Sequence, residues 1–350
     1  MFDILKELCA VNGTSGDEKD VSDYIIKFIE ENCSTDNVVA QRDIMGNVVV
    51  FKKGKAAPSK SVMFAAHMDE VGFIITDVTD EGFLKFAPVG GIADSAVFGR
   101  KVIFKNGVVG VIGGKPVHLC DEKEKDKQPK IDDLYIDIGA LDKADACEEA
   151  PFAKNKIKRG DFCYFIGEYE EFGNGKIRSK AIDDRLGCAI MLELLKSDLS
   201  YNCSFAFTVQ EEIGCRGAGA AVYNLEPDIC IVLEATTACD IAEVKDSDKV
   251  CELGKGAVVA FMDKGAIYDK ELYNIAFETA RDNKLKCQTK TKIVGANDSS
   301  TIHKAFGGVR TISLSVPCRY LHTPSCMVDK DDISQIRVLA EKLSERLAVL

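Results

Sequence analysis

Hydrophobic residues recur along the chain at two spacings, one typical of a helix and the other of a strand. Between residues 17 and 31, apolar side chains fall three or four positions apart. This spacing predicts an amphipathic helix, because an α-helix turns once in about 3.6 residues. Residues 47–51 and 61–66 are short apolar runs separated by a turn region that contains Gly and Pro, and both are predicted strands.

The pattern changes between residues 77 and 169. Short β-branched stretches are interrupted there by glycines, and a polar run at residues 121–127 is typical of a solvated loop. After residue 170, helix and strand spacings alternate. Helices are predicted at 186–196, 217–223, 272–281 and the C-terminus, and strands at 203–209, 229–234 and 310–316. We therefore expect an α/β domain made of residues 1–76 and 170–350, interrupted by a β domain at 77–169.

Length and charge restrict the class of protein. A chain of 350 residues corresponds to about two domains at roughly 150 residues each. The formal net charge of −11 argues against general binding to nucleic acids or anionic membranes. We find neither an apolar run of about 18 residues nor the apolar core of a signal peptide near the start. A cytoplasmic protein without nucleic-acid or membrane partners is therefore expected.

Fourteen cysteines and only four histidines are unusual numbers for a chain of this length. The cysteines are scattered from Cys9 to Cys326, contain no C-x-x-C pair, and in several cases lie within apolar runs. Free cysteine packs as a small hydrophobic residue, and disulfides are rare in the cytoplasm. We expect reduced, mostly structural thiols with no part in a metal site.

Polar side chains stand where two of the predicted elements begin or end. The apolar run before His67 is followed by Asp69, two positions on and therefore on the same face of a strand, where its carboxylate can orient the imidazole. Taken alone, a histidine such as His67 is more often a buried structural residue than a metal ligand. Asp183 and Asp184 directly precede a predicted helix. Each of the two acids suits the role of a helix N-cap as well as that of a metal ligand, and the sequence does not show which residue has which role.

Further acids and a second useful histidine follow other strands. Glu211 and Glu212 come after strand 203–209, Glu234 ends strand 229–234, and His322 lies beyond strand 310–316. Ligands of open α/β sheets bind at the carboxyl ends of the strands, and adjacent acids repel unless a cation lies between them. Nitrogen and oxygen donors suit Zn²⁺, Co²⁺ or Mn²⁺. So many acids fit two ions about 3.5–4 Å apart that share one carboxylate.

These motifs, in this order and spacing, resemble a known family. The chain is similar to the tetrahedral (TET) cytosolic dinuclear metalloaminopeptidases, also described as glutamyl aminopeptidases or "endoglucanase M"-like proteins. The similar segments are residues 13–18, 43–47, 66–73, 88–91, 137–140, 181–187, 210–214 and 319–324. The resemblance implies a mixed-sheet, three-layer catalytic domain of the zinc-exopeptidase type with an inserted β-barrel-like dimerisation domain. It also implies homodimers that assemble into a tetrahedral dodecamer and remove N-terminal residues from short peptides.

The same resemblance assigns roles to the candidate residues. Asp183 corresponds to the bridge between two divalent ions, Zn²⁺ or Co²⁺ with Mn²⁺ as a third option. His67 and Glu234 complete one ion's ligands, and Glu212 and His322 complete those of the other.

The resemblance implies two further roles, and two of the four histidines are not among the proposed ligands. Glu211 corresponds to the general base that takes a proton from water, and Asp69 to the residue that orients His67. His118 lies in the insert and is interpreted as structural. His303 follows residues 299–301, Ser-Ser-Thr, which depart from the small Ala and Gly residues typical of the family.

Three other functions compete with an aminopeptidase. A related metal-dependent amide hydrolase, of the deacetylase or carboxypeptidase type, would use a similar site. A glycosidase would need two carboxylates but neither a metal nor two histidines, and the chain has no tryptophan on which a sugar could stack. A scaffold or binding protein without activity would not require the complete set of polar residues.

Overall fold

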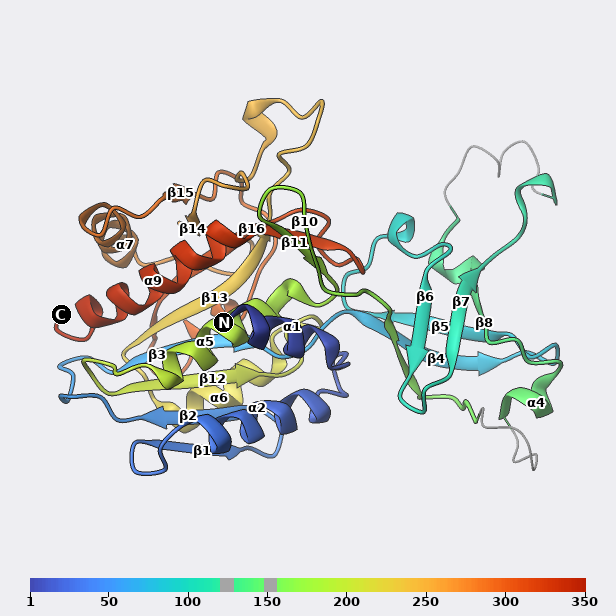
Figure 1. Ribbon diagram of the computed structural model, residues 1–350, viewed down its shortest axis with the longest axis horizontal. Coiled ribbons are helices and arrows are strands. Elements are labelled where there is room, and N and C mark those ends of the chain that lie inside the picture. The colour runs from blue at the N-terminus through green and yellow to red at the C-terminus, as the bar shows by residue number, and fades with distance from the viewer. Residues whose placement is uncertain (120–128, 148–155) are drawn as a thin grey trace.

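The computed structural model describes residues 1–119, 129–147 and 156–350, and its largest element is an eight-stranded sheet (Figure 1). The strand order is β1 (Val38–Arg42), β2 (Val48–Lys52), β12 (Cys203–Thr208), β3 (Val62–His67), β13 (Ile229–Thr237), β16 (Arg310–Cys318), β14 (Ala257–Val259) and β15 (Cys287–Thr289). The four central strands β12, β3, β13 and β16 are parallel, whereas β2 and β14 pair antiparallel with their inner neighbours. The sheet is mixed, and the predicted α/β class is confirmed.

Helices pack on both faces of this sheet. One face is covered by α1 (Phe2–Ala10), α2 (Lys19–Asn32), α5 (Ile182–Lys196), α7 (Lys270–Asp282) and α9 (Lys330–Leu347). The other carries α6 (Arg216–Leu225) and α8 (Ser299–Ile302). The predicted helices at 17–31, 186–196, 217–223, 272–281 and the C-terminus correspond to α2, α5, α6, α7 and α9. The sequence analysis did not predict α1.

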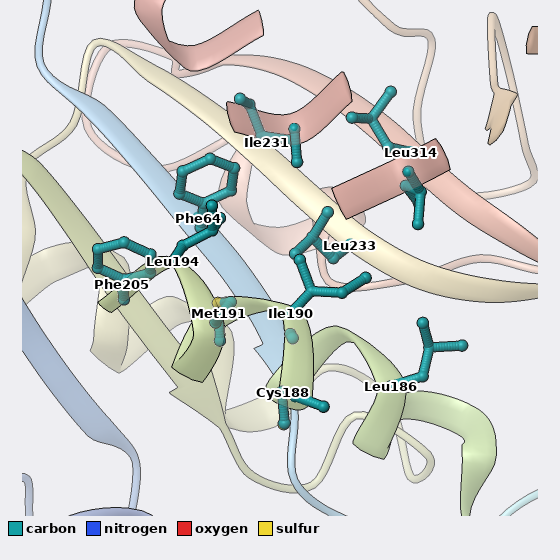
Figure 2. Packing of buried hydrophobic residues seen from close by; sticks show 14 of the residues in the cluster. Phe64, Leu186, Cys188, Ile190, Met191, Leu194, Phe205, Ile231, Leu233 and Leu314 are labelled. Carbon is teal, nitrogen blue, oxygen red and sulfur yellow. The ribbon is translucent and has the colours of Figure 1, made fainter. Parts of the chain in front are cut away.

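Alternation along the strands creates two cores. Phe64 of β3 points into the larger core and stacks on Phe205 of β12 with ring centroids 5.3 Å apart. Figure 2 shows these two rings beside Leu194 of α5. The neighbouring residues Met63 and Ala65 point to the opposite face, where they pack with α6 and α8. Because successive side chains of a strand face opposite ways, both faces of β3 are buried and its position is fixed.

The inserted region forms a closed barrel to one side of the large sheet (Figure 1). Its strand order is β4 (Gly72–Val78), β5 (Leu84–Val89), β8 (Tyr135–Asp137), β7 (Val109–Gly113), β6 (Lys101–Phe104) and β9 (Phe162–Phe165). Edge-to-face contacts of Phe73 with Phe86 and Phe165 fill its core. The predicted boundary between residues 76 and 77 falls inside β4, because this strand starts at Gly72. The division into two domains stays a prediction, and the loop predicted at 121–127 lies outside the described residues.

A small three-stranded sheet joins the barrel to the large sheet. It contains β10 (Glu170–Phe172), β11 (Lys176–Ser179) and β17 (Cys326–Asp329). The antiparallel pairing of β11 with β17 brings the start of α5 close to the loop between β16 and β17. Short helices complete the description: α4 (Lys143–Cys147) and 3-10 turns at Asp94–Ala96, Val117–Leu119, Ile131–Asp133 and Asp246–Asp248. In the described part of the chain, no helix is both long and apolar enough to cross a membrane.

Candidate active site

The predicted site residues gather at the carboxyl ends of the central parallel strands. His67 ends β3, Glu234 lies in the second half of β13, and His322 lies in the loop after β16. Glu211 and Glu212 lie in the turn between β12 and α6. Because parallel strands end at the same edge of a sheet, these segments meet although the sequence separates them widely.

Asp183 lies between the two histidines. Its Oδ1 is 3.3 Å from His67 Nε2, and its Oδ2 is 3.3 Å from His322 Nε2. Glu234 completes the first group, with Oε2 3.9 Å from His67 Nε2, and Glu212 completes the second, with Oε1 3.3 Å from His322 Nε2. In each group the three potential ligand atoms lie within 4.8 Å of one another. One carboxylate is therefore shared by two groups of potential metal ligands.

The neighbouring acid, Asp184, faces elsewhere. A cis peptide bond joins Asp183 to Asp184, and the Asp184 carboxylate accepts a hydrogen bond from the backbone N–H of Gly187 at 3.0 Å. Asp184 thus contacts the first turn of α5, as the N-cap alternative predicts, while Asp183 faces the histidines. The structure separates the roles of two residues that the sequence alone did not.

Both histidines direct Nε2 at the carboxylates. His67 Nδ1 lies 3.0 Å from the backbone oxygen of Asp69, and His322 Nδ1 lies 2.6 Å from the backbone oxygen of Gly91. A proton on Nδ1 is donated to these carbonyls, which leaves the Nε2 lone pair free for a cation. The Asp69 carboxylate also lies beside this ring, with Oδ1 3.5 Å from His67 Nδ1, and its role in orienting His67 stays a prediction.

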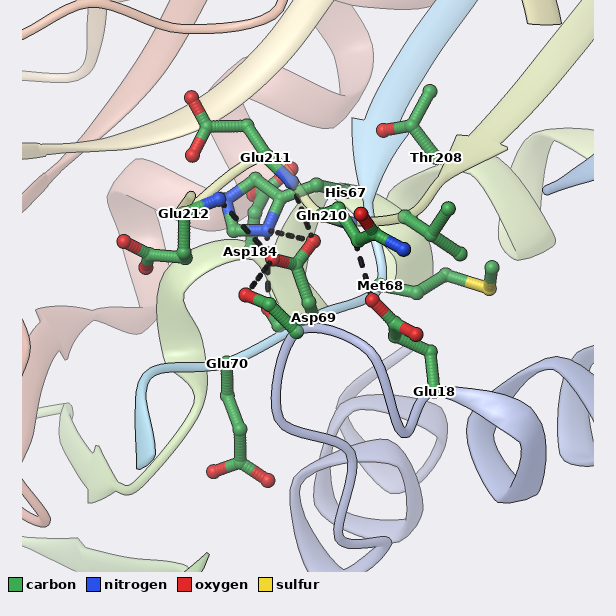
Figure 3. A network of polar contacts seen from close by, with 12 residues as sticks. Glu18, His67, Met68, Asp69, Glu70, Asp184, Thr208, Gln210, Glu211 and Glu212 are labelled. Carbon is green, nitrogen blue, oxygen red and sulfur yellow. Dashed lines mark hydrogen bonds and ion pairs between the residues drawn. The ribbon is translucent and has the colours of Figure 1, made fainter. Parts of the chain in front are cut away.

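The Asp69 carboxylate is also an acceptor for the turn that carries the two glutamates. It accepts hydrogen bonds from the backbone N–H groups of Glu211 at 3.0 Å and Glu212 at 3.1 Å, and from Ser15 Oγ at 2.6 Å. Dashed lines in Figure 3 mark the contacts of Asp69 with its neighbours. Burial acts to raise the pKa of Asp69, but these contacts and His67 outweigh burial, and its pKa is lowered.

Electrostatics at the site favour bound cations. Burial and neighbouring acids raise the pKa values of Glu211 and Glu234 well above the usual range, and raise that of Glu212 to about 7. Asp183 differs, because its contacts with the His322 and His67 rings outweigh burial and lower its pKa. In the part of the chain that the structure describes, the Oδ1 atom of Asp183 is buried without a hydrogen-bond partner. This donor set, two imidazoles and several carboxylates around an unsatisfied oxygen, fits two divalent cations.

A cavity of about 360 Å³ opens onto both groups of ligands. Lys290, in the wall of this cavity, is 8% exposed, and within the described chain its ammonium forms no ion pair. Burial lowers the pKa of Lys290. Cys215 lines the same cavity, 3.4 Å from Glu211. Lys290 was not predicted from the sequence, and thiols were expected to have no part in the site.

The remaining two histidines lie outside these groups. His303 Nδ1 is 2.6 Å from the backbone oxygen of Ser299, at the end of α8. His118 is exposed in the short turn Val117–Leu119 of the insert. In the residue 297–303 segment, Asn297 lines the cavity, and Asp298, which is 1% exposed, lies close to Glu211 and Cys215. A single acid between polar neighbours gives no signal in the sequence, so Asp298 was not predicted.

Two histidine–carboxylate groups at one edge of a mixed sheet define a candidate metal-dependent hydrolase. The chain belongs to the M42 glutamyl aminopeptidase family, whose sequence pattern matches residues 46–339. It is 32% identical to the glutamyl aminopeptidase of Lactococcus lactis, over 96% of this chain and 93% of the relative. It is 29% identical to the lysyl aminopeptidase of Pyrococcus furiosus, over 99% and 97%.

A solved structure supports the same assignment. The Pyrococcus horikoshii TET1 peptidase, described as assembling into a tetrahedron or a large octahedral shell, superposes with a TM-score of 0.82. The two sequences are 31% identical, and the match covers 98% of each chain. The resemblance expected from the sequence is therefore confirmed, and the protein is a member of a family of peptide hydrolases.

Proposed function

We propose that the protein is a dinuclear metal-dependent aminopeptidase that removes N-terminal residues from short peptides. The observation that carries the proposal is the position of Asp183, whose two oxygens face His67 and His322 separately. A carboxylate shared in this way is what two closely spaced ions require. Membership of the M42 family supports the peptide substrate.

The chain's own residues then have distinct roles. His67, Asp183 and Glu234 hold one divalent ion, and Asp183, Glu212 and His322 hold the other, with Zn²⁺ or Co²⁺ preferred and Mn²⁺ possible by donor type. When bound, the ions supply Lewis acidity that polarises the scissile carbonyl and makes a water molecule more acidic.

Glu211 is the general base of the proposal. It lies in the same turn as Glu212 and lines the same cavity as the two ligand groups. Its carboxylate takes a proton from the attacking water and returns it to the leaving amine. A raised pKa suits this role, because the group must hold the proton between the two transfers. Asp69 positions the turn and is not itself in the proton path.

The larger organisation is also part of the proposal. Residues 1–76 and 170–350 form the catalytic domain, with zinc-exopeptidase layering, and residues 77–169 form the dimerisation domain. Dimers assemble into a tetrahedral dodecamer that acts in the cytoplasm. The tetrahedral assembly of the Pyrococcus horikoshii peptidase supports this organisation.

Hydrolysis of a short peptide panel tests the function. We expect release of the first residue from peptides with a free N-terminus, none from the same peptides N-acetylated, loss of activity on chelation, and recovery with Zn²⁺ or Co²⁺. Release of C-terminal residues or of acetate would favour the carboxypeptidase or deacetylase alternative. Activity that survives chelation would contradict the metal mechanism, and release of sugar from a glucan would favour the glycosidase.

A further inference from the structure

A third cluster of potential metal ligands lies beside the two groups already described. It contains Glu211, Cys215 and Asp298, whose potential ligand atoms all lie within 4.8 Å of one another. The Cys215 thiol donates to Glu211 Oε1 at 3.4 Å. In a tetrahedral site with metal–sulfur bonds near 2.3 Å and metal–oxygen bonds near 2.0 Å, ligand atoms are separated by about 3.3–3.5 Å. The cysteine and the glutamate already have this spacing.

Asp298 supplies an independent reason to expect a cation. Its side chain is buried, and its Oδ2 accepts a hydrogen bond from Thr208 Oγ1 at 2.5 Å. Its other oxygen, Oδ1, is buried and has no hydrogen-bond partner among the described residues. A carboxylate oxygen without water or donor is strongly destabilising unless a cation or proton satisfies it. Within the described chain, no lysine or arginine forms an ion pair with Asp298.

The donors select the class of cation. One sulfur and two carboxylate oxygens suit a thiophilic divalent ion such as Zn²⁺ better than Mg²⁺ or Ca²⁺, which prefer oxygen alone. Ser300 Oγ lies 3.4 Å from Cys215 Sγ and donates to the sulfur.

We propose that Glu211, Cys215 and Asp298 form a third metal site, which takes a thiophilic divalent cation and inhibits the enzyme. Binding replaces the thiol proton of Cys215, which is released to solvent, and places the cation on the carboxylate of Glu211. Glu211 then no longer accepts a proton from water. The inhibitory effect rests on the proposed function, whereas the existence of the site does not.

Titration with Co²⁺ tests the site without measuring activity. The metal-depleted full-length protein is titrated while near-ultraviolet absorption is followed, because a thiolate bound to Co²⁺ gives a charge-transfer band that imidazole and carboxylate ligands do not. We expect the band to appear once the two histidine-containing groups are filled, to be absent in Cys215→Ser, and to persist in the control Cys239→Ser. No band in the wild type, or an unchanged band in Cys215→Ser, overturns the proposal.

Inhibition by Zn²⁺ tests the consequence. For enzyme loaded with two ions, we expect added Zn²⁺ to inhibit, and the inhibitory concentration to rise at least about tenfold in Cys215→Ser when each variant is normalised to its own uninhibited rate. Asp298→Asn provides a second variant if the first is unstable, and the same direction is expected. Wild-type sensitivity in both variants overturns the inhibitory role. A cobalt band without peptide hydrolysis would refute the proposed function but support the third metal site. Peptide hydrolysis without a cobalt band would refute the third metal site and not the proposed function.

Discussion

The backbone N–H of Glu211 donates a hydrogen bond to the side-chain Oδ1 of Asp69, across 3.0 Å and 142 positions of sequence. The other oxygen of Asp69 accepts from the next backbone N–H, that of Glu212. One buried carboxylate therefore fixes the turn that presents the proposed base and one proposed metal ligand. Asp69 is also adjacent to His67, which links the position of this turn to the end of β3.

Replacing Asp69 by asparagine should impair catalysis more than folding. The amide NH₂ would face a backbone N–H, so one of the two hydrogen bonds to the turn is lost and Glu211 is displaced. We expect kcat to fall by about 10- to 100-fold, the range typical of residues that orient a metal site. Steady-state kinetics measures the effect. The control is Asp77→Asn, an exposed aspartate of β4 that pairs with Arg159, and it should behave like the wild type.

The proposed base is tested by Glu211→Gln, which keeps the shape of the side chain but accepts no proton. We expect kcat to fall by about 10²- to 10⁴-fold, the usual contribution of general acid–base catalysis. Metal analysis should still find two ions per chain. The matched variant Glu212→Gln should instead lose one ion. Near-normal kcat in Glu211→Gln would remove this residue from the proton path.

The shared carboxylate is tested by comparing adjacent residues. Asp183→Asn removes charge from both ligand groups, and we expect loss of both ions. Asp184→Asn should retain both, since burial raises the pKa of Asp184 well above the usual range and makes a neutral amide a close substitute. Metal content of the purified variants, measured by elemental analysis, decides the question. Equal loss of metal in the two variants would contradict the assignment of Asp183 as the bridge.

The sequence could locate the strand ends because polar residues stop long apolar runs there, as His67 does after residues 62–66. The sequence could not show which atoms of Asp69 accept hydrogen bonds, since the hydrogen bonds from Glu211 and Glu212 join segments more than a hundred residues apart. Lys290, Cys215 and Asp298 reach the site from a loop, a turn and the start of α8, and none interrupts an apolar run. The strand β14 and the edge strand β15 were missed for another reason, because three residues are too few to show a period.

Truncating a buried side chain in the larger core should lower the stability of the protein. Phe64 is fully buried and stacks on Phe205, so Phe64→Ala should lower the free energy of unfolding by about 3–5 kcal/mol. Phe51 on β2 is 45% exposed, and Phe51→Ala should change this free energy by less than about 1 kcal/mol. Denaturant unfolding at one protein concentration compares the two. Similar losses would mean that the packing between β3 and β12 contributes less than its burial indicates.

Lys290 predicts the preferred first residue of the substrate. Its ammonium lines the cavity with no ion pair in the described structure, and burial makes an unpaired charge unfavourable. An acidic side chain on the first residue of a peptide would pair with it, and a basic one would be repelled.

We expect glutamyl-anilide to be hydrolysed with a higher kcat/KM than lysyl-anilide, and Lys290→Met to lose this preference. A charge-assisted hydrogen bond contributes about 1.5–3 kcal/mol, which corresponds to roughly a 10- to 150-fold loss of kcat/KM for the acidic substrate. The kcat/KM for leucyl-anilide should change much less, because the leucyl side chain does not pair with the charge of Lys290. Lys292→Met is the matched control, since Lys292 is two residues away and pairs with Asp248 at 3.8 Å. An unchanged glutamyl preference in Lys290→Met would show that another group recognises the first residue.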